Sequence, residues 1–582
     1  MSRATAKIRE AGSARDVVMF WAAAAVTLLA ALALGANRPI AWTALSLAAL
    51  GLGFMSLALS FATGRRARRL GALAPPLFLY ALVLLWACLQ ATPGLFSGWA
   101  HPAFAAAGVA APPLSLDPIN TWHGVFRLAA YAALFWIGVQ AGRRIGRRLI
   151  DVFALWSSLL ALYALGAHFT GFNPILGSAE AYDSLEGVFV NRNAYALYAG
   201  WGLTACFAAI AHRLRKVPWG ERHAPREAID VFFDGAWIFA IGAFLLMTAL
   251  LLTASRAGLM ATIVSLAVFF TLTRMRRKSG PGWDPTTILA LLLGLVVLFI
   301  SSEAVLSRFS EISDSSDDRM LMYGATLSAI AERPLLGYGL GAYEEGFRPF
   351  LPAGWAWGRP IDWDLAHSSY LENFFELGLP AAIAFYAALA MVFLRILRGA
   401  RERRRMIAPS AFAAALAASG AIHSIVDFPL QMPAITAFLA LALGVGWANS
   451  WPSERRRNRQ APILMPVYDY APPGAAPAPA AAPAGAFGRI EPSLRDDRGP
   501  LARTLGADGA GRRARSEDAD EFDEFDPEDF DPEDFDLDDL DHLDEEDDDL
   551  FAAERRPKSR DRDSAPQTPR SRWSMTPKRR RE

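Results

Sequence analysis

A histidine and two carboxylates lie close together in the stretch AHSSYLENFFELGLP, which leads into a long apolar run. His367 precedes this run. Glu372 and Glu376 follow His367, at the start of the run, and are four residues apart, which places them on one face of a helix. The pKa of an unperturbed histidine lies near neutral pH, so its side chain can act as a base. Carboxylates are stabilised near the start of a helix. We expect His367 to be a base, with helix capping or loop packing as its structural alternative, and the glutamates to cap the helix or brace arginines.

Two arginines stand at predicted helix starts. In VFVNRNAYA, Asn191, Arg192 and Asn193 precede an apolar span, and in TASRAG, Arg256 lies where two apolar spans meet. Asn193 fits a helix N-cap, whereas Arg192 does not, because a cation opposes the positive end of the helix dipole. A guanidinium presents a planar fork that suits phosphate oxygens. We therefore expect an anion near both arginines; for Arg256 the alternative is a tight turn without a ligand.

A third arginine and a glycine-rich segment lie between Arg256 and His367. Arg319 is followed by apolar residues at helical spacing as far as Glu332, which predicts an amphipathic surface helix; these residues are Met320, Tyr323, Leu327 and Ile330. The segment RPLLGYGLGAY predicts a tight turn, because it lacks the Lys and Ser/Thr of a nucleotide-binding P-loop.

A second histidine lies in AIHSIVDFPLQMPA. His423 and Asp427 are four residues apart, a spacing that places both on one face of a helix, and Pro429 and Pro433 mark the turn that follows. The pair is either a structural contact between helices or part of a substrate site.

The composition predicts an all-α polytopic membrane protein. Hydrophobic residues make up 53% of the 582 residues and the mean hydropathy is +0.21, which is high for a soluble protein of this length. The apolar residues form blocks of roughly 17–25 residues, the length that crosses a bilayer core of about 30 Å. We predict about twelve spans, with these approximate limits: 17–35, 40–62, 74–91, 122–141, 149–168, 193–212, 233–253, 256–273, 286–302, 369–396, 409–428 and 431–449.

Basic clusters define the orientation of these spans. RRARR, RRIGRR, RLRK, RMRRK, RGARERRRM and SERRRNR each follow an even-numbered span. The positive-inside rule then places them, and both termini, in the cytoplasm. The polar candidates fall on the outer side, together with large loops at about 92–121, 169–192 and 303–368.

Residues 454–582 differ from the apolar part of the chain. A Pro/Ala/Gly-rich stretch at 471–487 precedes an acidic tract at 517–551 that repeats FDPEDF. Such a composition buries too little apolar surface to fold alone. We predict a disordered cytoplasmic tail, which either solubilises the protein or docks into a basic groove of a cytoplasmic protein partner through spaced apolar residues: Phe530, Phe535 and Leu540.

The outer candidates favour one class of ligand. Charged groups at membrane depth are costly and usually face a cavity or a partner. ATP is absent outside the cytoplasmic membrane, so a group transfer there needs a donor that is already activated. A lipid-linked diphosphate sugar is such a donor, and its anion matches the arginines.

The chain resembles the O-antigen ligase/polymerase superfamily of bacterial inner-membrane proteins over roughly residues 15–450. The most specific segment is a ligase pattern of His, then Asn, Ser or Gln, nine residues, Gly, two residues and a small residue or Tyr. His367, Ser368 and Gly378 follow this spacing, and Ala381 stands where the pattern has Gly, Thr or Tyr. VFVNRNAYA, TASRAG, RPLLGYGLGAY and HSIVDFPLQMPA resemble family segments in the same order.

This resemblance implies an all-helical membrane glycosyltransferase fold of the GT-C type that works without a metal or another cofactor. It implies transfer of a glycan from undecaprenyl diphosphate to a hydroxyl of lipid A–core, in a ligase, or of a growing glycan, in a polymerase. His367 would be the general base, while Arg192, Arg256 and Arg319 would bind the diphosphate. The other candidates for the substrate site are Asn191, Asn193, Glu372, His423 and Asp427. No nucleic-acid partner is expected.

The predicted organisation is a cytoplasmic N-terminus at 1–16, too polar for a signal peptide, an O-antigen ligase-like transmembrane domain at 17–453 and the tail at 454–582. One alternative is a transporter or flippase for the same lipid-linked glycans, since about twelve spans suit transporters too. Another is a membrane scaffold of a polysaccharide synthesis complex, whose acidic tail recruits cytoplasmic enzymes.

Overall fold

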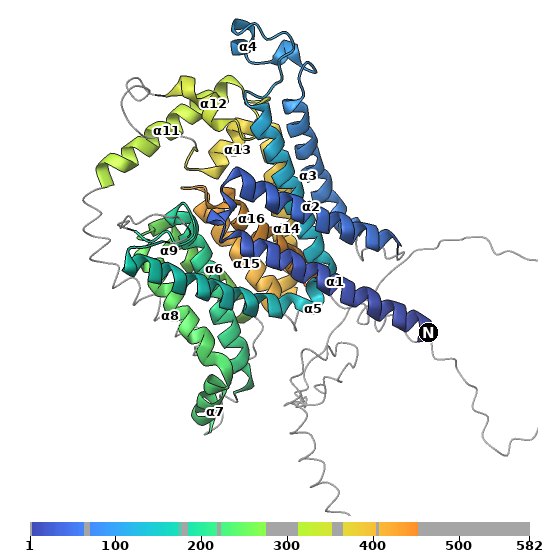
Figure 1. Ribbon diagram of the computed structural model, residues 1–582, viewed down its shortest axis with the longest axis vertical. Coiled ribbons are helices and arrows are strands. Elements are labelled where there is room, and N and C mark those ends of the chain that lie inside the picture. Colours follow the sequence, from blue (N-terminus) through green and yellow to red (C-terminus); the bar gives the residue numbers. More distant parts are fainter. Residues whose placement is uncertain are drawn as a thin grey trace, which may run out of the picture. The chain divides into compact units, whose positions relative to one another are not determined.

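The computed structural model describes residues 3–62, 70–173, 175, 184–217, 223–274, 312–351, 365–402 and 407–451. Every regular element that these residues form is a helix (Figure 1), which confirms the all-α prediction. The span predicted at 286–302 and the tail predicted at 454–582 lie outside the described residues.

The α-helices are α1 (Arg3–Ala30), α2 (Pro39–Ala62), α3 (Leu70–Ala91), α4 (Pro102–Ala106), α5 (Pro118–Thr170), α6 (Arg192–Arg213), α7 (Ala224–Val231), α8 (Trp237–Leu252), α9 (Arg256–Arg274), α11 (Ile312–Glu332), α12 (Tyr343–Phe347), α13 (Ser369–Leu377), α14 (Leu379–Glu402), α15 (Ala408–His423) and α16 (Pro433–Ala448). Single turns of other helix types join them: η1 (Leu34–Ala36), η2 (Ser97–Trp99), η3 (Leu214–Lys216), η4 (Phe232–Ala236), η5 (Arg348–Phe350) and η6 (Pro429–Gln431).

Eight helical segments of the described residues are long and apolar enough to cross a membrane, which supports a multi-pass membrane protein. They are Pro39–Phe61, Gly71–Ala91, Pro118–Ala141, Ile145–Thr170, Arg192–Arg213, Ala224–Leu252, Arg256–Arg274 and Leu379–Glu402. Each overlaps one predicted span. The spans predicted at 409–428 and 431–449 correspond to the shorter helices α15 and α16.

The spans predicted at 122–141 and 149–168 belong to one continuous helix, α5, of 53 residues. The basic segment RRIGRR between them is helical, although the sequence indicated a loop there. Arginine favours helices and no proline interrupts the segment, so nothing in it ends the helix. The Asp117 carboxylate caps the helix start by accepting the Asn120 N–H at 2.9 Å, and Gly171 ends the helix in the left-handed conformation at φ 68.

The span predicted at 369–396 is broken at Gly378, which lies between α13 and α14 at φ 76. A Cβ there would lie 2.5 Å from the carbonyl oxygen of Leu335, so only glycine fits. Glu372 and Glu376 were expected on the first turns of a membrane span. They lie instead on the separate nine-residue helix α13, outside the apolar segment Leu379–Glu402.

Close helix contacts hold the apolar bundle together. α5 packs along α16, and α6 packs against α8, α9 and α15. A Cβ on Gly138 of α5 would lie 2.5 Å from the Leu441 carbonyl oxygen of α16, so glycine permits this backbone approach. Trp201 of α6 donates its indole N–H to the Ser419 hydroxyl of α15 at 2.8 Å. These contacts fix the helix ends that carry several candidate residues.

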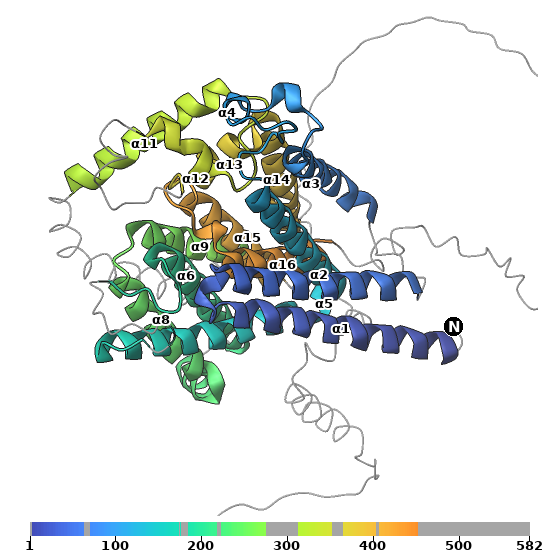
Figure 2. The same cartoon turned by 45° about the horizontal axis from the view of Figure 1, so that its top comes forward.

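A second apolar cluster lies among α11, α12 and α13, which are grouped at one end of the bundle (Figure 2). The Phe375 ring stacks on Tyr338 with ring centroids 4.2 Å apart, and Tyr343 and Phe347 pack around it. This cluster joins α13 to the chain segment that precedes it, and so supports the residues that enter α13.

The surface helix predicted to end at Glu332 is confirmed as α11. Its buried face differs from the predicted apolar stripe. Met322, Thr326 and Ala329 are buried, whereas Met320 and Leu327 remain 67% and 55% exposed. Thr326 is buried because its hydroxyl bonds the Tyr343 hydroxyl at 2.8 Å, a contact that hydropathy does not predict.

Candidate active site

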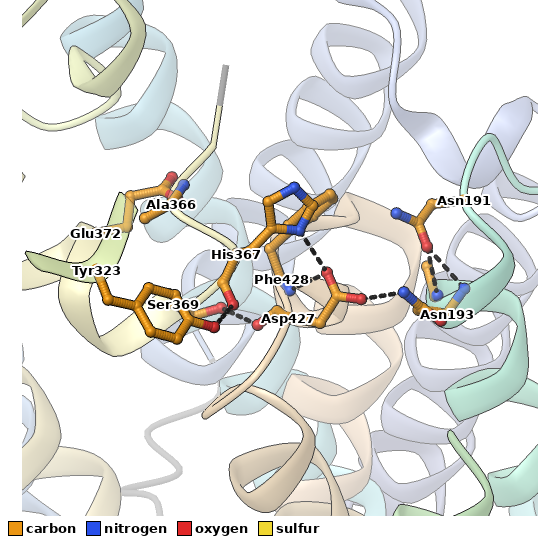
Figure 3. A network of polar contacts seen from close by, with 10 residues as sticks. Asn191, Asn193, Tyr323, Ala366, His367, Ser369, Glu372, Asp427 and Phe428 are labelled. Atoms are coloured by element: carbon orange, nitrogen blue, oxygen red, sulfur yellow. Dashed lines mark hydrogen bonds and ion pairs between the residues drawn. The ribbon is translucent and has the colours of Figure 1, made fainter. Parts of the chain in front are cut away.

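His367 lies on the short segment that enters α13, with its backbone in the left-handed region at φ 49. A residue other than glycine keeps this conformation only where neighbouring groups hold it. Two hydrogen bonds do so. The Tyr323 hydroxyl on α11 donates to the His367 carbonyl oxygen at 2.9 Å, and the Ala366 N–H donates to Glu372 Oε2 at 3.0 Å (Figure 3). The His367 ring is thereby directed toward Asp427.

Asp427 is the centre of this polar network, and its side chain is 2% exposed (Figure 3). Oδ1 lies 3.6 Å from His367 Nδ1 and accepts the Phe428 N–H at 2.9 Å. Oδ2 accepts the side-chain amide of Asn193. The Ser369 hydroxyl donates to the Asp427 carbonyl oxygen at 3.4 Å. Residues of α6, of α13 and of the segment after α15 therefore meet at one buried carboxylate.

The surroundings of Asp427 keep it ionised. Burial raises the pKa of Asp427, but hydrogen bonds from His367 and the Phe428 N–H, together with the nearby histidines, hold that pKa below its ordinary value. A buried carboxylate that stays charged can orient the His367 ring and stabilise positive charge on it. The His367 side chain is 29% exposed, so the pair joins a buried acid to an accessible base.

The asparagines at the start of α6 exchange their expected roles. Asn191, and not Asn193, caps the helix: its Oδ1 accepts the N–H groups of Asn193 at 2.7 Å and Ala194 at 3.2 Å (Figure 3). This leaves the Asn193 side chain to bind Asp427. The sequence could not distinguish these roles, because both residue types and positions fit a cap.

α15 ends at His423, and Asp427 lies in the turn beyond it, where its N–H donates to the His423 carbonyl oxygen at 3.2 Å. His423 is 1% exposed. Among the described residues, neither of its ring nitrogens has a hydrogen-bond partner. The two residues are close enough for the charge of His423 to lower the pKa of Asp427, so a role for their contact stays a prediction. The ion pair of Asp427 is with His367, which lies far from it in the sequence.

Arg192 and Arg256 are the first residues of α6 and α9. The two helix starts lie together, because a Cβ on Gly258 would overlap the Ala196 side chain. Arg192 is half-buried and Arg256 is exposed. Burial raises the pKa of Glu186, and the positive charge of Arg192 opposes this rise. The structure thus brings both arginines to the end of the bundle that carries Asn193.

The tight turn considered as the alternative for Arg256 is present. Ala254 has φ 50, and the Ser255 hydroxyl accepts the Gly258 N–H at 3.0 Å. This side-chain cap explains where α9 begins. This cap does not require an arginine at position 256.

Arg319 lies on α11, one turn before Tyr323. Burial raises the pKa of Tyr323, the charge of Arg319 lowers it, and the charge of Asp427 raises it. Tyr323 therefore lies within electrostatic reach of both groups. Arg319 therefore lies near the tyrosine that bonds His367, and Arg192 precedes Asn193, which bonds Asp427.

The two glutamates of α13 have different surroundings. Glu372 is in the first helical turn, 5% exposed, and binds the Ala366 N–H. Glu376 is in the last turn, 4% exposed. Burial raises the pKa of Glu376 to about 7, although the backbone N–H groups of Gly341 and Tyr343 bond it and Arg127 is near. Glu372 therefore supports the His367 segment, whereas Glu376 supports the glycine-rich turn.

The glycine-rich turn predicted in RPLLGYGLGAY is confirmed, and its backbone binds α13. The N–H groups of Tyr338 and Gly339 donate to the carbonyl oxygens of Phe375 at 3.0 Å and Glu376 at 2.9 Å. Gly339 has φ 111, and a Cβ there would lie 2.5 Å from Ser115 Cβ. These amides face protein groups, so the turn holds α13 in place and is not a phosphate cradle.

Tyr323 and Ser369 are site residues that the sequence did not reveal. Tyr323 was recognised only as part of an apolar stripe, and Ser369 was not singled out. Both act on backbone atoms, so neither residue type nor spacing signals the role. Within the described part of the chain, no group of three or more His, Cys, Asp or Glu side chains could hold a metal ion.

Residues 241–386 match the family model described as O-antigen ligase. The matched stretch includes Arg256, Arg319, His367 and the break at Gly378, whereas Asn193 and Asp427 lie outside it. No curated protein matches the chain. The match thus covers His367 and two of the three arginines, and the carboxylate beside His367 comes from beyond it.

Proposed function

We propose that the chain is a member of the O-antigen ligase/polymerase superfamily, whose ligase model residues 241–386 match, and that it transfers a glycan from undecaprenyl diphosphate to an acceptor hydroxyl at the outer face of the bacterial inner membrane. The O-antigen ligase match supports glycosyl transfer of this type. The acceptor is lipid A–core or a growing glycan. The observation that carries the proposal is the pairing of a half-buried histidine on the matched segment, His367, with the buried carboxylate of Asp427, which lies beyond that segment.

His367 is the general base of the proposed reaction. Its Nδ1 faces Asp427 at 3.6 Å, so Nδ1 carries the proton and Nε2 accepts one from the acceptor hydroxyl. Asp427 selects this tautomer and stabilises the imidazolium that forms, as a carboxylate does behind other catalytic histidines. Asp427 is thus a positioning residue rather than a proton acceptor.

The arginines stabilise the leaving group. Arginine stays protonated at working pH, so it provides charge and not proton transfer. Arg192, Arg256 and Arg319 come from three helices, and a bidentate guanidinium suits diphosphate oxygens. Arg256 is the most exposed of the three, so we expect it to be the first to meet a membrane-bound diphosphate.

The reaction balances without another reactant. The acceptor oxygen forms a bond to the anomeric carbon, and the bond from that carbon to the diphosphate oxygen breaks. The hydroxyl proton moves to His367 Nε2, and undecaprenyl diphosphate leaves as an anion held by the arginines. A single displacement inverts the anomeric centre.

The test is the profile of undecaprenyl-diphosphate-linked glycans in host cells that lack this protein. Accumulated long chains with bare lipid A–core identify a ligase, and accumulated single repeat units identify a polymerase. An unchanged profile contradicts the proposal. Re-expression of the wild-type chain should restore the original profile, while the His367→Ala variant at equal membrane abundance should not.

A further inference from the structure

A second basic cluster lies away from His367, between α2 and α5. His123 and Arg127 are four residues apart on α5, so they share a helix face. The Arg127 guanidinium lies over the Trp42 ring of α2, 5.1 Å from its centroid. The His123 and Trp42 ring centroids are 6.1 Å apart. We call these three residues the α2–α5 cluster.

The hydrogen-bonding groups of this cluster are incompletely used. Trp42 Nε1 and His123 Nδ1 are buried, and neither has a partner among the described residues. No carboxylate in the described part of the chain forms an ion pair with Arg127. Buried donors are nearly always bonded in folded proteins. A guanidinium, an indole N–H and an imidazole nitrogen that lie in one cluster are groups that match an anion with several oxygens.

The position of Arg127 makes the cluster costly without a ligand. Arg127 is the tenth residue of the apolar segment Pro118–Ala141, about 14 Å along the helix from its start. A charged group at such depth requires a partner. The charge of Arg127 acts on Glu376, but the Glu376 carboxylate already accepts hydrogen bonds from the backbone N–H groups of Gly341 and Tyr343. Neutralising Glu376 therefore does not account for Trp42 and His123.

The surroundings of the cluster favour a lipid. Phe126, next to Arg127, is 52% exposed, and Ile40, at the start of α2, is 87% exposed. Apolar side chains exposed on membrane-crossing helices face hydrocarbon. Arginine on a helix leans toward the helix start, which brings the guanidinium toward the headgroup level. A ligand with a phosphate head and a hydrocarbon tail fits both features.

We propose that the α2–α5 cluster binds the phosphate of a second lipid-linked substrate, separate from the diphosphate at Arg192 and Arg256. The assignment of this lipid to the transfer reaction rests on the proposed function, whereas the binding of a lipid phosphate does not. Arg127 supplies the charge, Trp42 supports the guanidinium face and donates its N–H, and His123 supplies a further hydrogen bond.

The test is native mass spectrometry of the full chain in detergent, titrated with undecaprenyl phosphate. The wild type should bind two lipid molecules. The Arg127→Gln variant and the Arg192→Ala/Arg256→Ala double variant should each bind one. Arg213→Gln is the matched control, because Arg213 also stacks on an aromatic ring, Phe239 at 4.3 Å, and should leave both molecules bound. Circular dichroism checks that each variant is folded.

The outcomes separate the two proposals. Two lipids bound to folded Arg127→Gln overturn the α2–α5 site. If inorganic phosphate at equal concentration displaces the lipid from this site as well as undecaprenyl phosphate does, the ligand is free phosphate and the lipid assignment fails. His367→Ala should still bind two lipids. If that variant also keeps full transfer activity, the proposed base is wrong while the lipid site stands.

Discussion

His367 and His423 both lie beside Asp427, yet their surroundings are different. His367 is 29% exposed on a short loop segment, and its Nδ1 lies 3.6 Å from the carboxylate. His423 ends α15, is 1% exposed, and has no hydrogen-bond partner for either ring nitrogen within the described residues. A base needs both a group that orients it and access to its substrate. Only His367 has both, and spacing along the chain does not reveal this difference.

The largest expected effect is the loss of the His367 imidazole. His367→Ala should lower the turnover of transfer by about 10²- to 10⁴-fold, the usual contribution of a general base, with little change in donor binding. His423→Phe, which replaces the buried ring with one lacking unpaired nitrogens, should change turnover less than about threefold. The assay uses membranes and donor lipids extracted from cells that lack the protein. Equal losses of turnover in the two variants would contradict the assignment of the base to His367 alone.

The second effect concerns the carboxylate that the two histidines flank. Asp427→Asn keeps the shape of the side chain but removes its charge, so the His367 imidazolium is no longer stabilised. We expect turnover to fall about 100-fold, less than the about 10⁴-fold loss seen when the acid behind the histidine of a serine protease is neutralised, because the 3.6 Å separation is longer than a good hydrogen bond. The Michaelis constant for the donor should change little. Since Asp427 lies outside the family match at 241–386, unchanged turnover would indicate that the base acts without it.

The candidate site was only partly predictable from the sequence. His367 and Asp427 were both singled out, because their residue types suit chemistry at a membrane surface. Their pairing depends on α13 and the end of α15 coming together, and no local pattern contains that information. Asn191 and Asn193 show the same limit: both types fit a helix cap, and only the approach of Asp427 decides which side chain is left for the site.

The third prediction tests the backbone conformation of His367, which has no counterpart at His423. Tyr323→Phe removes the hydroxyl that holds the His367 carbonyl at 2.9 Å. We expect turnover to fall about tenfold, as for one lost hydrogen bond to a strained segment, without loss of donor affinity. Tyr80→Phe is the matched control, since the Tyr80 hydroxyl also donates to a main-chain carbonyl, that of Leu128 at 2.8 Å, and it should keep full turnover.

A double variant shows whether Tyr323 acts through His367. In the His367→Ala background, Tyr323→Phe should cause no further loss, because the group it positions is already absent. A further tenfold loss would mean that Tyr323 supports the fold generally or contacts the substrate itself. Thermal unfolding of the single variants distinguishes these two explanations.

The fold was more predictable than the site, because hydropathy depends on local composition. Apolar runs predicted the membrane-crossing segments, and helical spacing predicted α11. The prediction errors occurred at positions where tertiary contacts determine the local structure. Gly378 breaks a predicted span because Leu335 lies against it, and RRIGRR stays helical within α5 because no residue in it ends a helix. Thr326 is buried on α11 because it bonds Tyr343.

The smallest expected effect extends the comparison to two buried carboxylates. The contacts of Asp427 outweigh burial and hold its pKa below the ordinary value, whereas burial raises the pKa of Glu376 from 4.5 to about 7. Between pH 4.5 and about 7, the folded chain binds a proton at Glu376 that the unfolded chain does not. The stability from this group is therefore complete below about pH 4.5 and is lost as the pH rises through about 7.

Glu376→Gln mimics the protonated side chain at every pH. The melting temperatures of the wild type and this variant should agree near pH 5, and the wild type should fall below the variant by about 2–4 °C near pH 8. The exposed Glu344 offers a control, since Glu344→Gln should give a difference from wild type that does not change with pH. A constant difference for Glu376→Gln would mean that Glu376 is ionised throughout this range. The two buried carboxylates would then be alike.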